Sequence, residues 1–343
     1  MHGVTSADVA RDSGVSRTTV SYVLNDTPGV RVSEETRARV RASADRLGYH
    51  PSVAARTLRT GRSDLVLYVL PDWPLGPAVD TLLDRLAGAL AERGLSLLVH
   101  HARSGRPLHE LWRAVTPRAV VGLQAFSARD RDAMRRAGIH VVASSISGDV
   151  PDVFAATQQG IGRLQARHLL ERGHTPVGYA APTDPRVRAF AELRLAGVQA
   201  VCAEAGLPAP VVVPVELTQD SARAAVRAWR DAAAGTAGTA GPGADGTAAP
   251  AVAGVAAYND DVALAVLAGA RAEGVPCPGE LAVVGVDDIP AARFAEPALS
   301  TVSQSLDTQA EHLAAAVVAA LDGTDSDGGP VPDTLELVER AST

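Results

Sequence analysis

The sequence is poor in the residues that mark several classes of protein. Among its 343 residues only two are cysteines and 3% are aromatic, and lysine is absent. Two distant thiols, Cys202 and Cys277, exclude a disulfide-rich scaffold and indicate free cysteines in a reducing compartment. No apolar run reaches the roughly 18 residues of a membrane span, and Met1 leads into the first expected helix without a signal peptide. We therefore expect a cytoplasmic protein with no membrane partner.

Motifs of catalysis and cofactor chemistry are also missing. The chain has no G-x-G-x-x-G after an expected strand, no P-loop, no G-x-S-x-G and no histidine or cysteine cluster at metal-ligand spacing. The nearest approaches, His100 with His101 and His168 with His174, are weak candidates. We predict that the protein is not an enzyme and has no catalytic residue, metal or cofactor.

Charge is unevenly distributed along the chain. Residues 1–62 contain ten arginines and six acids, whereas the whole chain has a net charge of −7. A basic segment on an acidic remainder is expected when only one domain meets nucleic-acid phosphates. At 343 residues the chain is long enough for such a head and for further domains with a substantial core.

The first 25 residues predict two short helices joined at a glycine. Thr5 or Ser6 caps the first helix, Gly14 ends it, and the second helix starts after Ser16. Such a pair is a helix-turn-helix, whose second helix lies in the major groove of DNA. The expected inner face is apolar and comprises Val9, Ala10, Val15, Val20, Val23 and Leu24. The residues left pointing outward are Arg17, Thr18, Ser21 and Tyr22.

Two further motifs follow in a fixed order. G-V-S-R-T-T-V-S at 14–21 is followed by V-S-E-E-T-R-A-R-V at 32–40, which predicts a third helix capped by Ser33. L-G-Y-H-P-S-V-A-A-R-T-L then occupies 47–58. These motifs closely resemble the DNA-binding end of the lactose-repressor (LacI/GalR) family of bacterial transcription regulators. The resemblance in strand and helix order covers the whole chain.

The resemblance implies a hinge helix after Pro51 that folds on operator DNA. An isolated helix of about two turns is marginal in water, so DNA would have to hold it. Leu58 matches the leucine that the family inserts into the minor groove, where an apolar wedge kinks the duplex. The alternative is an ordinary core leucine. The expected DNA-contacting residues are Ser16, Arg17, Thr18, Ser21, Tyr22, Asn25, Arg31, Ala54, Arg56, Leu58 and Arg59.

Arg17 is the best candidate for direct base readout. A guanidinium can bond guanine O6 and N7 together, although Arg17 could instead contact a phosphate. Tyr22 departs from the family, which mostly has arginine there, so it should read different bases or turn its phenol to a phosphate. Arg31, Arg56 and Arg59 are expected to contact the DNA backbone.

From residue 64 onward, apolar strands alternate with helices. Strands are expected at 65–70, 96–100, 119–123, 140–144, 177–181, 211–215, 252–258, 281–286, 299–304 and 335–338. Regular alternation predicts parallel sheets covered by helices on both faces. The resemblance implies that these form an α/β periplasmic-binding-protein-like core of two doubly wound parallel-sheet lobes.

We expect a small all-α helix-turn-helix DNA-binding domain at 1–50, a hinge helix and linker at 51–62, and a bilobed effector-binding and dimerisation core at 63–343. The N-lobe is expected at about 63–157 plus 288–318, and the C-lobe at about 158–287 plus 319–343. The Ala/Gly/Thr/Pro-rich stretch 232–250 indicates a flexible insertion without assigned function. No leucine heptad tail follows the last strand, which favours a homodimer over a coiled-coil tetramer.

The resemblance places a small-molecule effector between the lobes, where strand ends gather polar residues. The matching residues are Asp72, Trp73, Arg194, Asn259 and Asp287. Arg194 is implied to hold polar groups of the effector, and Asp287 to accept from its hydroxyls or an amine. The alternative is an internal salt bridge between these two side chains.

Two departures from the family weaken the prediction of a sugar effector. Gln158 and Gln159 replace the family's usual Asp-Asn pair, and Leu217 stands where an aromatic side chain normally stacks on the effector. With few aromatic side chains, a sugar or polyol is expected rather than a flat purine. We predict a sequence-specific transcription regulator, a repressor of operator DNA controlled by such an effector. The alternatives are a regulator with altered or lost effector sensing and a solute-binding protein of the same core fold.

Overall fold

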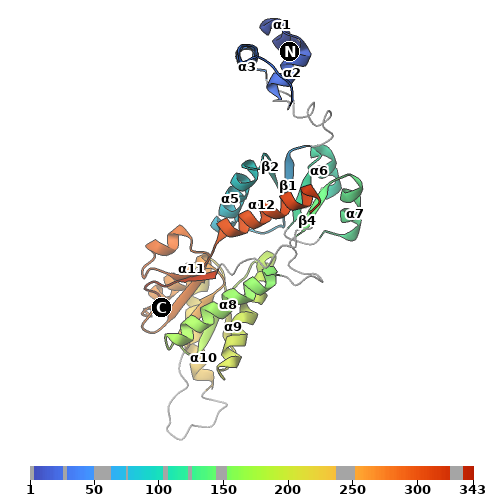
Figure 1. Ribbon diagram of the computed structural model, residues 1–343. Coiled ribbons are helices and arrows are strands. Elements are labelled where there is room, and N and C mark those ends of the chain that lie inside the picture. The colour runs from blue at the N-terminus through green and yellow to red at the C-terminus, as the bar shows by residue number, and fades with distance from the viewer. Residues whose placement is uncertain are drawn as a thin grey trace. The chain divides into compact units, whose positions relative to one another are not determined.

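The computed structural model describes residues 4–25, 29–49, 63–74, 76–102, 107–122, 126–143, 153–236, 252–324 and 335–343. The chain separates into two compact units (Figure 1). The first unit contains residues 1–64 together with 116–118, and the second contains the remaining residues.

Three helices form the described part of the first unit. They are α1 (Ser6–Ser13), α2 (Arg17–Leu24) and α3 (Glu34–Leu47). Thr5 and Asp8 form a capping box at α1, and Gly14 ends this helix in the left-handed conformation. Ser16 and Ser33 cap α2 and α3, so the predicted caps are confirmed. The helices bury a small common core of Val9, Ala10, Val20, Val23, Val40 and Ala44.

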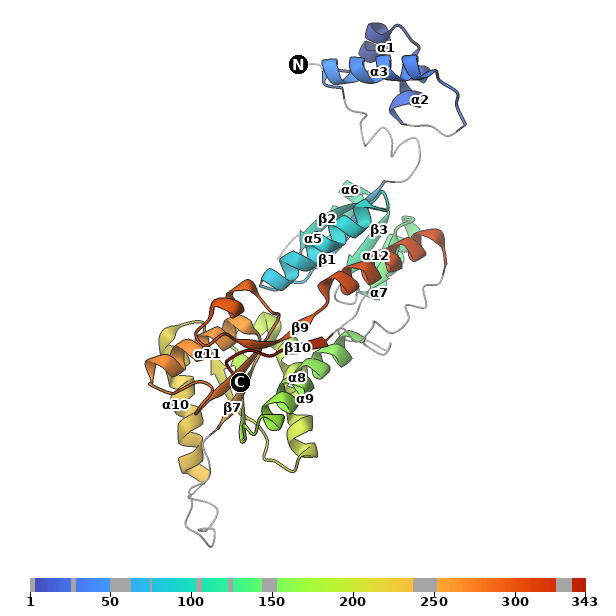
Figure 2. The same ribbon diagram turned by 60° about the vertical axis from the view of Figure 1, so that its left-hand side comes forward.

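The described part of the second unit contains two sheets. The first sheet has four parallel strands in the order β2-β1-β3-β4. These are β1 (Leu65–Leu70), β2 (Ser96–His101), β3 (Ala119–Gly122) and β4 (His140–Ala143). One face packs against two helices that lie side by side, α5 (Pro77–Ala91) and α12 (Leu306–Asp322) (Figure 2). The other face packs against α6 (Leu108–Val115) and α7 (Ala128–Arg136). We call this sheet and its helices the N-lobe.

The second sheet has six strands in the order β10-β9-β8-β7-β5-β6. These are β5 (Val177–Pro182), β6 (Val211–Val215), β7 (Gly254–Ala257), β8 (Ala282–Val286), β9 (Ser300–Gln304) and β10 (Leu335–Val338). Only β10 is antiparallel to its neighbour. Two short 3₁₀ helices, η1 (Pro185–Val187) and η2 (Pro290–Phe294), follow β5 and β8. We call this sheet and its helices the C-lobe.

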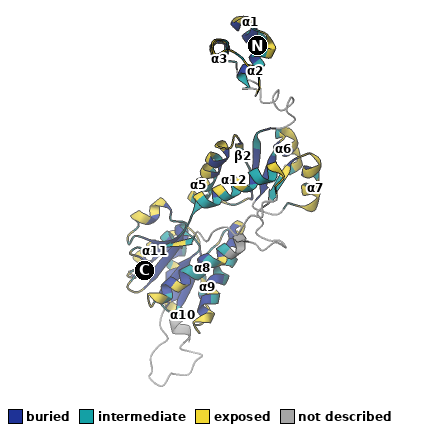
Figure 3. Cartoon of the chain, in the orientation of Figure 1, coloured by how far each residue is buried: buried dark blue, intermediate teal, exposed yellow. Residues whose placement is uncertain are grey.

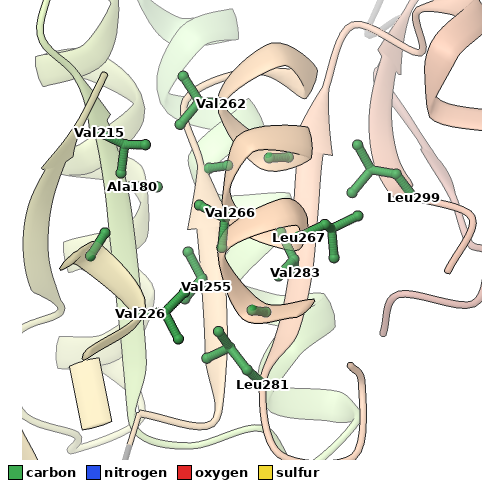
Figure 4. Packing of buried hydrophobic residues seen from close by; sticks show 14 of the residues in the cluster. Ala180, Val215, Val226, Val255, Val262, Val266, Leu267, Leu281, Val283 and Leu299 are labelled. Carbon is green, nitrogen blue, oxygen red and sulfur yellow. The ribbon is translucent and has the colours of Figure 1, made fainter. Parts of the chain in front are cut away.

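Helices cover both faces of the C-lobe sheet, as a parallel sheet requires. One face packs against α8 (Val153–Glu171) and α9 (Arg188–Glu204). The other packs against α10 (Gln219–Thr236) and α11 (Asp260–Ala272), where Val266 and Leu267 of α11 meet Val255 and Val283 of the strands (Figure 4). The central strands β7 and β8 are buried throughout, whereas the helices expose one side to solvent (Figure 3). The predicted pair of doubly wound lobes is confirmed.

The expected lobe boundaries need two corrections. We expected 288–318 in the N-lobe, but β9 is hydrogen-bonded between β8 and β10 of the C-lobe sheet. The chain crosses to the N-lobe only at Ser305, the cap of α12. We expected the C-lobe to resume at residue 319, but α12 packs against α5 and ends at Asp322. The sequence of a strand does not show which strands it pairs with, because strand pairing depends on hydrogen bonds to segments that are distant in the sequence.

Two other expected segments lie wholly or partly outside the described residues. The hinge segment 51–62 lies outside them. Of the insertion expected at 232–250, residues 232–236 belong to helix α10, and 237–250 lie outside the described residues.

Candidate functional site

Helix α2 presents the side chains that the sequence predicts for base contacts. Arg17 and Thr18 are exposed in its first turn, and Tyr22 is 37% exposed one turn later. Val20 and Val23 are each 1% exposed on the opposite face. The helix therefore has one apolar side in the core and one polar side that is accessible, which a helix entering the major groove requires.

Some predicted DNA contacts also stabilise the ends of α2. Ser16 Oγ accepts from the Thr19 N–H at 3.1 Å. The Asn25 amide donates to the Ser21 carbonyl oxygen at 2.7 Å and to Ser21 Oγ at 3.2 Å. Short polar side chains at helix ends bond backbone groups that the helix leaves unpaired. The structure thus adds a helix-end role for Ser16, Ser21 and Asn25, and their DNA contacts stay a prediction.

The arginines of the first unit differ in their pairing. Arg11 Nη1 lies 3.1 Å from Asp8 Oδ1, so its charge is met within the domain. Arg17 and Arg31 are exposed, and neither forms an ion pair with any residue that the structure describes. Their guanidinium groups keep all their donors for an external anion or a base edge.

The hinge contacts are not among the described residues. Ala54, Arg56, Leu58 and Arg59 all lie outside the part of the chain that the structure describes. The minor-groove wedge therefore stays a prediction.

In the second unit, Arg194 of α9 is buried and fixed by neutral partners. Arg194 is only 5% exposed. Nε donates to Gln158 Oε1 at 2.8 Å, and Nη1 donates to the Tyr258 carbonyl oxygen at 2.5 Å. The guanidinium carbon lies 4.8 Å from the centroid of the Tyr258 ring. Because Gln158 supplies an amide where the family has a carboxylate, the buried cation has a fixed orientation but no counterion at this contact.

Asp287 follows β8 in an unusual backbone conformation, with φ 107°. Burial raises the pKa of its carboxyl group to about 6, although the nearby charge of Arg194 lowers this pKa in part. No ion pair joins Arg194 to Asp287 in the described residues, so the predicted alternative of an internal salt bridge is not observed. Both groups keep hydrogen-bonding capacity that a polar ligand can use.

Asn259 sits at the end of β7 and has a structural role that sequence reasoning missed. Its Oδ1 accepts from the Val262 N–H at 3.0 Å, which caps α11. The cap could have been recognised from the Asn-Asp-Asp start of an expected helix. Among the described residues the side-chain amide nitrogen of Asn259 has no hydrogen-bond partner, so its donors can still serve a ligand.

Asp72 and Trp73 follow β1 of the N-lobe and meet the C-lobe. Asp72 Oδ1 lies 3.8 Å from Arg186 Nη1. The Trp73 and Phe190 rings pack edge to face, with centroids 4.4 Å apart and an interplanar angle of 78°. Sequence reasoning missed Arg186 and Phe190, because only the folded chain brings η1 and the start of α9 to the end of β1.

A separate hollow, partly open to solvent, lies at the start of α9. It is lined by Tyr179, Ala181, Pro182, Thr183, Asp184, Pro185, Arg188, Ala191, Glu192 and Leu195. None of the five predicted effector residues lines it, so we do not assign it to the effector.

Other candidate chemistry is limited in the described residues. They hold no group of three or more His, Cys, Asp or Glu side chains that could bind a metal ion. Cys202 and Cys277 are free, as predicted, and burial raises the pKa of both thiols, that of Cys277 to about 11. Among the described helices none is long and apolar enough to cross a membrane.

Two family models match the chain. Residues 5–52 match the model described as bacterial regulatory proteins, lacI family. Residues 166–343 match the model of a periplasmic binding protein-like domain. The first match contains all three head helices, and the second covers most of the C-lobe.

Curated relatives and solved structures resemble the chain over nearly its whole length. The transcriptional regulator CelR of Thermobifida fusca is 30% identical over 96% of this chain and 94% of its own. GalR of Escherichia coli strain K12 is 27% identical over 97% of this chain and 92% of its own. A structure of CelR with cellobiose is 26% identical, has a TM-score of 0.62 and covers 99% and 100% of the two chains. The lac repressor dimer bound to operator and the anti-inducer ONPF is 21% identical with a TM-score of 0.75, covering 99% of each chain, which shows a shared fold.

Proposed function

Because the chain belongs to the lacI family of bacterial regulatory proteins, it is a DNA-binding transcription regulator, and we propose that it is a homodimeric repressor released from its operator by a sugar. Two heads of a homodimer would bind two half-sites of a pseudo-palindrome. Since its target is operator DNA, we propose that it acts in the cytoplasm.

The effector proposal is carried by one observation, the buried guanidinium of Arg194 without a carboxylate at its contacts. A sugar hydroxyl accepts from a guanidinium and donates to a carboxylate, so one polyol can use both Arg194 and Asp287. Trp73 and Phe190 add apolar rings suited to the C–H face of a sugar. The 26% identical relative CelR binds cellobiose in its structure, which supports the same ligand class here.

Leu217 weighs against a stacked purine. It stands where the family has an aromatic side chain, and it is 65% exposed. An exposed aliphatic side chain provides no ring on which a base could stack. A sugar needs hydroxyl partners more than a stacking ring, so the proposal survives this substitution.

A thermal-shift panel of cellobiose, other sugars, sugar phosphates, polyols and nucleosides tests the effector class. We expect a sugar to raise the unfolding temperature, because a ligand at 100 times its Kd adds about 2.7 kcal/mol to the folded state. A hit confined to nucleosides would contradict the sugar proposal. A silent panel with specific operator binding intact would instead indicate a regulator that senses no sugar.

Arg17→Ala is expected to relax base preference at one position of each half-site. The loss of a bidentate contact to guanine reduces discrimination there by about 1–3 kcal/mol. The measurement is the affinity of the full chain for an operator selected from random DNA and for its single-base variants. Arg11→Ala is the matched control, because Arg11 is also exposed but is paired with Asp8. If Arg17→Ala weakens every DNA sequence by the same factor, Arg17 contacts a phosphate instead.

A further inference from the structure

The turn that carries Asp287 adopts a backbone conformation rare outside glycine. Directly after β8, Asp287 has φ 107° and Asp288 has φ 48°. Two such residues in succession persist only where the surrounding contacts hold them. Asp287 N–H donates to the Val302 carbonyl oxygen at 2.9 Å, which fixes the first residue of the turn to β9. The rest of the turn needs other anchors.

Asp288 is anchored by charge on the outside of the turn. Its two carboxylate oxygens accept from Arg340 Nη2 and from Arg293 Nη2, the latter at 3.1 Å. Both carboxylate oxygens of Asp288 are therefore bonded to arginines. The neighbouring carboxylate, Asp287, forms no ion pair in the part of the chain that the structure describes, although the charge of Arg194 lies near it.

Asp260 anchors the turn from the inside. It is the first residue of α11 and is 0% exposed. Its Oδ2 accepts from the Ile289 N–H at 2.9 Å, and its Oδ1 accepts from Thr301 Oγ1 at 2.6 Å. The Thr301 hydroxyl in turn accepts from the Asp288 N–H at 3.4 Å. One carboxyl group therefore ties α11 to the turn and to β9.

The chain packs closely around the carboxyl group of Asp260. A Cβ on Gly285 would lie 2.1 Å from Asp260 Oδ1, so β8 has a glycine where the carboxyl group approaches. No described cation forms an ion pair with Asp260, and burial raises its pKa to about 7. The carboxylates of Asp287 and Asp288 raise this pKa further, whereas the hydrogen bonds from Thr301 and Ile289 lower it. Burying a carboxyl group without a nearby cation costs free energy of folding. The hydrogen bonds that Asp260 accepts from the turn and from β9 offset this cost and explain why an acid stands at this position.

We propose that Asp260 is a positioning residue that holds the effector-binding carboxylate of Asp287 in place and thereby sets the affinity of the C-lobe for a sugar. The proposal rests on the proposed role of Asp287 as a sugar ligand. Asp260 itself is fully buried and acts only through the turn.

The experiment compares full-length wild type with Asp260→Asn, Asp287→Asn and the double variant. Asparagine keeps the size of the side chain but replaces one accepting oxygen with a donor. Asp261→Asn, on the same helical turn, is the control for the change in charge. Thr301→Val removes only the bridging hydroxyl and is a second test if Asp260→Asn folds poorly. The readouts are amide exchange of the segment 287–289 and the affinity for cellobiose, or for the sugar that gives a thermal shift.

We expect Asp260→Asn and Thr301→Val to speed exchange at Ile289 and to weaken sugar binding, each by about tenfold, as the loss of a buried hydrogen bond does. Asp261→Asn should leave the exchange rate at Ile289 and the sugar affinity within about threefold of the wild-type values. In the Asp287→Asn background, Asp260→Asn should cause no further loss of sugar affinity, because coupled residues are not additive. Unchanged exchange in Asp260→Asn, or additive losses in the double variant, would overturn the proposal. A wild type that binds no sugar would refute the proposed effector, while the exchange measurement would still decide whether Asp260 holds the turn.

Discussion

Gly162→Ala is expected to destabilise the C-lobe by about 3 kcal/mol or more. Helices α8 and α9 cross at a point where their backbones touch. A Cβ on Gly162 would lie 1.9 Å from the carbonyl oxygen of Arg194, and a Cβ on Gly197 would lie 2.1 Å from that of Gln159. Both obstacles are backbone atoms, so no side chain can move aside to admit a methyl group.

The same crossing also positions residues of the proposed effector site. Gln158 and Arg194 lie next to these contacts and are joined by a 2.8 Å hydrogen bond. Helices pushed apart by a methyl group would lengthen that bond. Gly162→Ala should therefore lower sugar affinity as well as stability, even though Gly162 has no side chain to offer a ligand.

Gly88→Ala is the matched control for Gly162→Ala. Gly88 also lies inside a helix, α5, but a Cβ there would meet no atom within 4 Å. Alanine at this position should stabilise the chain by about 0.5–1 kcal/mol, because glycine is a poor helix former. Urea unfolding of both variants measures the difference. A Gly162→Ala variant as stable as Gly88→Ala would contradict the described helix crossing.

The three-helix DNA-binding domain, α1 to α3, could be predicted almost completely from the sequence. Its helix ends are set by local signals, such as the Thr5–Asp8 capping box and the glycine after α1, and its core follows the helical period. The alternation of strands and helices likewise predicted both lobes, because each helix or strand can be recognised from the hydrophobic pattern of a short run of neighbouring residues.

The lobe to which β9 belongs could not be predicted in this way. Its partners β8 and β10 are chosen by hydrogen bonds between distant segments, and the strand motif is the same whichever sheet it joins. The same limit applies to the site. The resemblance predicted Arg194 and Asp287 as effector contacts, but it could not show which residues bond to Arg194 or to Asp260, because these partners lie far away in sequence. Gln158 is 36 residues from Arg194, and Thr301 is 41 residues from Asp260.

The second large effect is expected for Arg194→Met, which should raise the sugar concentration needed for operator release by about 100-fold. Methionine keeps the apolar stem but removes the guanidinium, and hydrogen bonds from a charged group contribute about 1.5–3 kcal/mol. Arg163→Met is the control. Arg163 lies on the neighbouring helix α8, and its ion pair with Glu204, at 2.5 Å, is partly exposed. Such pairs contribute at most about 1 kcal/mol, so the control should fold and respond like wild type.

The measurement that tests the central claim most directly is the fluorescence anisotropy of a labelled operator during a sugar titration of wild type, Arg194→Met and Arg163→Met. The account predicts equal operator affinity for all three without sugar. It also predicts that wild type and Arg163→Met release the operator at the same sugar concentration. Arg194→Met should release it only at a sugar concentration about 100 times higher. Release of all three at one concentration, or a wild type that stays on its operator at every concentration of every sugar, would contradict it.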